Sequence, residues 1–124
     1  MKLLVAVCLL AALYGVQADN WAVLVAGSNG FWNYRHQTDI CHSYQILITN
    51  GIPADHIIVL SYDDVANSTQ NPVKGKLFNK PTYDKPGKDV YAGCKIDYSG
   101  DAVTPENFLA VITGDAKTAG GRVL

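Results

Sequence analysis

The sequence predicts an α/β fold, and three consecutive segments support this prediction. Residues 21–26 form an unbroken apolar run of strand length, and residues 56–62 form a second one. Between them, residues 38–50 carry apolar side chains at helical spacing. A strand, a helix and a strand in this order form a right-handed unit with parallel strands. Because ligands of such sheets bind beyond the carboxyl ends of the strands, the residues after position 26 are the first candidates for a site.

The helix is expected to begin at Thr38, whose side chain can cap the first turn, beside Asp39. Asn50-Gly51 should end it. Its single apolar stripe is made of Ile40, Cys41, Tyr44, Leu47 and Ile48.

The second half of the chain is less regular. Residues 63–103 are rich in Asn, Pro, Gly, Lys and Tyr, with brief extended pieces expected near 76–79 and 89–91. Thr104-Pro105 predicts the start of a second helix that stops at Gly114, and Val123-Leu124 looks like the start of a third strand. Two strands and two helices give each apolar face too few partners, so we expect the chain to be part of a larger domain.

We expect residues 1–18 to be a signal peptide and residues 19–124 to be the N-terminal part of the mature domain. Lys2 precedes the apolar run 3–13, and Val16 and Ala18 occupy the positions where signal peptidase requires small residues. The run is short for a membrane-spanning helix, which predicts a luminal or secreted product without a stable membrane anchor.

Secretion gives meaning to the sequon Asn67-Ser68-Thr69, a candidate glycosylation site in a polar loop. Cys8 leaves with the expected signal peptide, so Cys41 and Cys94 are the only mature thiols. Whether they pair depends on a separation that the sequence does not show. We expect two unpaired cysteines, with Cys41 buried as a small hydrophobe.

Composition and motifs argue against nucleic acid, metals and cofactors. The chain of 124 residues has a formal net charge of -1, and lysines between 74 and 88 alternate with Pro, Gly and Asp as in a solvated loop. Residues 26–30 lack the complete glycine pattern of a dinucleotide site, and Ser28 lacks the Gly-x-Ser-x-Gly context of an elbow nucleophile. The spacing of His36, Cys41 and His42 does not suit a metal, and His42 is expected on the helix surface.

Asn33, Arg35 and His36 are the strongest site candidates. At the mouth of the first strand, an arginine can bind a carboxylate or an amide through its planar fork, and an adjacent histidine can donate or accept beside it. The alternative is that Arg35 and His36 are surface charge at a helix start. Asp63-Asp64, at the end of the second strand, is expected to be a solvated turn.

Several stretches together closely resemble the legumain family of asparaginyl endopeptidases, in order and with sensible spacing through nearly all of the mature chain. The longest is Val-Leu-Val-Ala-Gly-Ser-Asn-Gly-Phe-Trp-Asn-Tyr-Arg-His-Gln at 23–37. The others are Cys-His-Ser-Tyr-Gln, Asn-Gly-Ile-Pro, Tyr-Asp-Asp, Asn-Pro, Asp-Val-Tyr-Ala-Gly, Asp-Tyr-Ser-Gly and Val-Thr-Pro-Glu-Asn-Phe-Leu.

This resemblance implies a caspase-like α/β/α sandwich with a mainly parallel sheet, of which only the N-terminal part is present. It implies a hemoglobinase-type cysteine endopeptidase that cleaves protein and peptide substrates after Asn, in lysosomal or endosomal compartments or after secretion. In the family pattern, Arg35 and His36 line the pocket for the Asn side chain, and Asn33 orients the catalytic histidine. A C-terminal propeptide is expected in the full-length protein.

The family's reaction centre is not found in this chain. Legumains carry a His-Gly and a Glu-Ala-Cys at the ends of two later strands, and neither sequence occurs in the 124 residues. Thr113-Gly114-Asp115 stands where some members have Arg-Gly-Asp, so integrin binding is not carried over. Two other functions stay open: a non-catalytic or transamidase-like family member that acts as a binding subunit, and a small nucleotide-binding α/β module.

Overall fold

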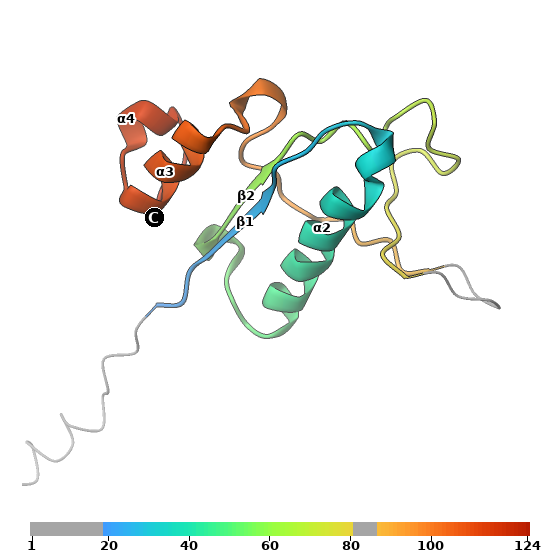
Figure 1. Ribbon diagram of the computed structural model, residues 1–124. Coiled ribbons are helices and arrows are strands. Elements are labelled where there is room, and N and C mark those ends of the chain that lie inside the picture. Colours follow the sequence, from blue (N-terminus) through green and yellow to red (C-terminus); the bar gives the residue numbers. More distant parts are fainter. Residues whose placement is uncertain (1–18, 81–86) are drawn as a thin grey trace, which may run out of the picture.

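The computed structural model describes residues 19–80 and 87–124. Strands β1 (Ala22–Ala26) and β2 (Ile57–Ser61) form a parallel sheet in which Ala22 pairs with Ile57 and Ala26 with Ser61. Helix α2 (Tyr34–Thr49) connects the two strands (Figure 1). The predicted strand, helix and strand order is confirmed. The expected signal peptide at residues 1–18 lies outside the described residues.

Helices cover both faces of this small sheet. Strand β2 is buried along its whole length, and its side chains alternate between two core clusters. Ile57 and Val59 pack with residues of α2, whereas Ile58 and Leu60 pack with residues of α3 (Pro105–Thr113) and α4 (Ala116–Ala119). Figure 1 shows α2 on one side of the strands and α3 with α4 on the other. This arrangement of helices and strands is consistent with a caspase-like α/β fold.

Helix α2 begins four residues earlier than predicted. A 3-10 turn, η1 (Phe31–Asn33), leads directly into it at Tyr34. Thr38 is therefore inside the helix, where it is 1% exposed and its hydroxyl donates to the Tyr34 carbonyl at 2.7 Å. The prediction of Thr38 as the cap was wrong because Gly30 adopts a positive φ of 80°, which lets the chain turn into the helix sooner.

Residues 62–80 and 87–104 form mostly short loops that contact the regular elements. The extended pieces expected near 76–79 and 89–91 meet in an antiparallel bridge between Phe78 and Asp89. Cys41 and Cys94 form a disulfide across a separation of 53 residues, with their Cα atoms 5.5 Å apart. The expectation of two unpaired cysteines was wrong. Residues 90–94 fold back over α2, and this long-range approach has no signature in the local sequence.

The C-terminal part of the structure confirms the predicted start and end of the second helix but not the predicted third strand. Thr104 caps α3 by accepting from the Asn107 backbone N–H at 3.1 Å, and Gly114 ends the helix in the left-handed conformation. Val123-Leu124 is not a strand; instead, the Leu124 N–H donates to the Val111 carbonyl at 3.0 Å. Across residues 19–80 and 87–124, we find no helix with the length and apolar character needed to cross a membrane.

Candidate substrate-binding site

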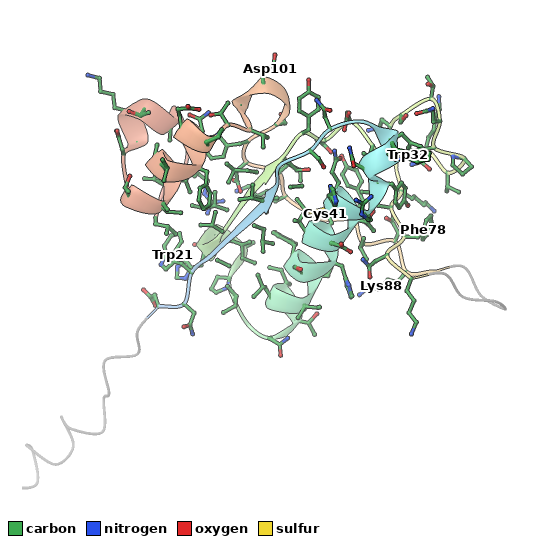
Figure 2. The ribbon with its side chains drawn as sticks, in the orientation of Figure 1. Trp21, Trp32, Cys41, Phe78, Lys88 and Asp101 are labelled. Carbon is green, nitrogen blue, oxygen red and sulfur yellow. A yellow bond between two sulfur atoms is a disulfide. The ribbon has the colours of Figure 1, made fainter. Side chains whose placement is uncertain are left out.

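The candidate site lies where β1 and β2 end. A cavity of about 300 Å³ opens there, lined by the last residue of β1 and residues 27–29, by Tyr62 after β2, and by Gly100 and Asp101 before α3. In Figure 2, Asp101 lies on the loop that leads to α3, whereas Trp32 lies at the start of α2. The crevice expected beyond the carboxyl ends of the strands is therefore present.

A larger cavity of about 420 Å³ lies elsewhere, against the outer surface of α2. Its lining includes His42, Ile46 and Lys88. Asn33, Arg35 and His36 line neither this cavity nor the one at the strand ends. His42 is exposed on the helix, as predicted. We place the site at the strand ends because hydrogen bonds connect the side chains of Ser28 and His36, and of Gln37 and Asp64, there.

Asp64 fastens the loop after β1 to the end of β2. One carboxylate oxygen accepts from the Gly30 backbone N–H at 2.7 Å, and the other accepts from Gln37 Nε2 at 2.7 Å. Gln37 is only 2% exposed, and its side-chain oxygen accepts from the Val65 N–H at 3.3 Å. Asp64 is thus a structural clamp, and its prediction as part of a solvated turn was wrong.

Asp63 is also held in place. Its backbone has a φ of 62°, in the left-handed region that non-glycine residues rarely adopt. Its carboxylate accepts from the Tyr91 hydroxyl at 2.9 Å. Burial of the phenol, followed by this hydrogen bond and the negative charge of Asp63, raises the pKa of Tyr91 to about 12. The loop around Tyr91 is thereby tied to the end of β2.

The three predicted site residues lie together on η1 and the first turn of α2. Asn33 Nδ2 donates to the Asn29 carbonyl at 2.9 Å, which closes the loop on itself. Arg35 is exposed, and its guanidinium has no ion pair or hydrogen bond within residues 19–80 and 87–124. His36 is half-buried, with Nδ1 2.6 Å from Ser28 Oγ.

Two residues of this arrangement, Ser28 and Asp64, were missed as contributors to the site. Ser28 was considered only as a nucleophile, and Asp64 only as a turn residue. A signal for Asp64 existed, because residues that follow adjacent parallel strands meet at the same sheet edge. The contact of Ser28 with His36, eight positions away, depends on the path of the loop and has no comparable signal.

Other features bear on what the site can hold. Trp32 is 93% exposed beside Asn33. Among the described residues, no group of three or more His, Cys, Asp or Glu side chains could hold a metal ion. The side chains at this edge carry amide, guanidinium, imidazole, hydroxyl and carboxylate groups, all of which can bind a polar side chain through hydrogen bonds.

Parallel strands with helices on both faces and a polar crevice at the strand ends define an α/β domain with a candidate ligand site. The family comparison refines this class. The sequence model of the peptidase C13 family matches residues 20–124, so the chain belongs to the peptidase C13 family.

Individual relatives agree with this assignment. The chain is 56% identical to legumain from Mus musculus over 103 residues, which are 83% of this chain and 23% of that protein. It is 55% identical to hemoglobinase from Schistosoma japonicum over 104 residues, 84% and 23% of the two chains. It is also 55% identical to legumain from Canavalia ensiformis over 102 residues, 82% and 21% of the chains. The chain therefore spans less than a quarter of the length of these relatives.

Proposed function

We propose that this chain is the N-terminal part of a cysteine endopeptidase that cleaves after Asn, and that Arg35 and His36 bind the Asn side chain. The observation that carries the proposal is the exposed Arg35 guanidinium, which has no partner within the described residues. A cation in the first turn of α2 opposes the helix dipole at a cost of about 0.3–1 kcal/mol. Helix stability therefore does not account for arginine at this position, whereas ligand binding does.

The chemistry of a carboxamide fits these residues. Its oxygen needs donors, and the Arg35 fork supplies them, with His36 beside it. Its amide group needs acceptors, which in the family belong to later segments. Asn33 is assigned to orient the catalytic histidine of those segments, and its own hydrogen bond to Asn29 holds it at the site edge.

Arg35→Ala in the full-length protein tests the assignment. If Arg35 binds the carboxamide, kcat/KM for an Ala-Ala-Asn reporter should fall by at least about 100-fold, because the buried amide loses its charged donor. Lys88→Ala is the matched control, since it removes an exposed cation that lines the distant cavity beside α2. Unchanged Asn kinetics in Arg35→Ala would remove this residue from the pocket.

The nucleophile and the base are proposed to lie outside these 124 residues. The purified chain should then fail to cleave the reporter, and measurable cleavage would contradict the assignment. The transcript beyond the Leu124 codon is the direct test. A continuation through His-Gly and Glu-Ala-Cys would support an active endopeptidase, and a continuation without them would favour a non-catalytic, transamidase-like binding subunit.

We further propose that the protein enters the secretory pathway by cleavage after Ala18 and reaches lysosomes or the cell exterior, with its propeptide in later segments. Asn67 is exposed in its loop, which supports its glycosylation. The expressed protein should lose mass on treatment with a peptide N-glycosidase, and Asn67→Gln should remove the share of that loss carried by this site. An Asn67→Gln protein of unchanged mobility would show that the sequon is unoccupied.

A further inference from the structure

We propose that Ser28 is a positioning residue that holds the His36 imidazole with its Nε2–H directed away from Ser28 as a hydrogen-bond donor. The inference rests on the proposed function insofar as that donor serves the Asn pocket. Its geometric basis is the 2.6 Å separation between Ser28 Oγ and His36 Nδ1, a short contact between two side chains that are both half-buried.

The distance fits either partner as the donor, and hydrogen-bond pairing favours the proton on Nε2. With the proton there, the Ser28 hydroxyl of neutral His36 donates to Nδ1, whereas with the proton on Nδ1 the hydroxyl hydrogen would have no acceptor among the described residues. In the imidazolium form, Nδ1–H donates to Ser28 Oγ, and Nε2 still carries its proton. A hydroxyl can play both parts, whereas a carbonyl or an ammonium could play only one. Nε2–H is thus a donor in either protonation state.

Nothing else in residues 19–80 and 87–124 hydrogen-bonds to the His36 ring. Nε2–H is therefore available to a ligand, on the residue that follows Arg35 in the sequence. Donors on these two neighbouring residues suit the two lone pairs of a carboxamide oxygen. This fit assigns His36 a donor role, in place of the donor or acceptor role that the sequence left open.

The Asp64 clamp holds both partners of the contact. It accepts from the N–H of Gly30, two residues after Ser28, and from the side chain of Gln37, the residue after His36. Ser28 follows the end of β1, whereas His36 lies in the first turn of α2. The clamp therefore fixes the path of the loop between them, so that the hydroxyl and the ring meet without a conformational search.

The test uses the full-length protein labelled with ¹⁵N-histidine. Two-bond ¹H–¹⁵N spectra distinguish a protonated from an unprotonated ring nitrogen, and His36→Asn identifies the His36 signals by their loss. In the unsubstituted protein at neutral pH, His36 should show a protonated Nε2 and an unprotonated Nδ1. A protonated Nδ1, or a mixture of tautomers, would overturn the proposal without the need for any variant at Ser28.

Substitutions then connect the tautomer to catalysis. Ser28→Ala should move the His36 ring to a mixture of tautomers and lower kcat/KM for the Asn reporter by about tenfold, the effect of one lost hydrogen bond. Ser28→Thr keeps the hydroxyl and should restore the spectrum. Ser43→Ala is the matched control, because it removes a serine hydroxyl from α2 that donates to the Asp39 carbonyl and not to a histidine.

The outcomes separate this inference from the proposed function. An unchanged His36 spectrum and unchanged kinetics in Ser28→Ala would overturn the role of Ser28 while leaving Asn cleavage in place. A single Nε2–H tautomer in a protein that does not cleave after Asn would retain the positioning by Ser28 and overturn the proposed function.

Discussion

The β1-α2-β2 unit and the segment that follows it, described at residues 62–80 and 87–104, are held by different interactions. The first buries continuous apolar faces: Ile57 to Leu60 are completely inaccessible, and they pack with helices on both sides. In residues 62–80 and 87–104, the second has no helix or strand longer than three residues, and specific polar contacts and one disulfide attach these residues to α2 and β2. The comparison shows that burial of apolar side chains stabilises the β1-α2-β2 unit. Polar contacts and a disulfide instead hold the loops after β2 and the candidate site in place.

Residues of the loops after β2 nevertheless form a small hydrophobic core with α2. Val65, Ala66, Leu77 and Val90 cluster around Cys41 of α2. Backbone groups are anchored by side chains of the same helix: Tyr34 accepts from the Phe78 N–H at 2.8 Å, and Gln45 donates to the Ala92 carbonyl at 2.8 Å. Helix α2 thus serves both regions, and its first turn carries the candidate site.

Leu60→Ala should produce the largest loss of stability, because Leu60 belongs to the region that apolar burial stabilises. Leu60 is fully buried in the cluster beneath α3 and α4, and its truncation leaves a cavity. The free energy of unfolding should fall by about 3–5 kcal/mol, measured by urea denaturation. Leu109→Ala is the control: Leu109 is 56% exposed on α3, so its loss should cost far less. Equal effects would mean that the frame does not depend on this burial.

Cys94→Ser removes the disulfide that attaches the loops after β2 to α2. The disulfide closes a separation of 53 residues, and its loss should lower the free energy of unfolding by about 2–4 kcal/mol through the larger entropy of the unfolded chain. The unsubstituted protein treated with a reducing agent should match the variant. If reduction changes nothing while Cys94→Ser destabilises, the effect comes from the side chain and not from the covalent link.

Asp64→Asn tests the residue that connects the two regions, because Asp64 follows β2 and accepts hydrogen bonds from Gly30 and Gln37. The amide keeps the shape of the carboxylate but cannot accept strongly from both the Gly30 N–H and Gln37 Nε2. Stability should fall by about 2 kcal/mol, as for a hydrogen bond to a charged group, and kcat/KM for the Asn reporter should fall with it.

Asp55→Asn is the control for this change, because Asp55 is exposed and its carboxylate makes no hydrogen bond to another described residue. If Asp64→Asn lost stability but kept full activity, the clamp would support the fold without positioning the site.

The same division explains what could be predicted. Apolar runs and helical spacing predicted β1, α2, β2 and α3, because burial leaves a periodic pattern in the sequence. The Cys41–Cys94 pair joins residues 53 positions apart, and no local pattern encodes their meeting. Asp64 contacts residues 34 and 27 positions away; the strand order indicates the edge where it lies but not these partners. The start of α2 was misplaced for a related reason, since Gly30 and Asp64 together shape the turn that precedes it.

The site itself remains a prediction. Asn33, Arg35 and His36 were proposed because they follow a strand, and they lie on η1 and the first turn of α2. Their roles remain predictions. Ser28 was dismissed as a nucleophile on its motif, and its contact with His36 became visible only from the folded loop.

Tyr91→Phe should have the smallest effect and the most informative pH dependence. At about pH 8 the variant loses the hydrogen bond to Asp63, which should cost about 1 kcal/mol. Burial and Asp63 raise the pKa of Tyr91 to about 12 from 10.0. The folded protein therefore keeps the phenol proton above the pH at which the unfolded chain releases it. Between about pH 10 and 12 the unfolded state binds fewer protons, so stability must fall as the pH rises.

Phenylalanine cannot ionise, so the variant should lack this part of the alkaline loss. The urea midpoints of the two proteins should differ most at about pH 8 and converge as the pH approaches about 11. Tyr62→Phe is a matched control, because the Tyr62 hydroxyl makes only a 3.4 Å contact with Asp101 on the surface. A constant difference across this range would mean that Tyr91 titrates alike in both states, and that its contact with Asp63 does not fasten the loop in solution.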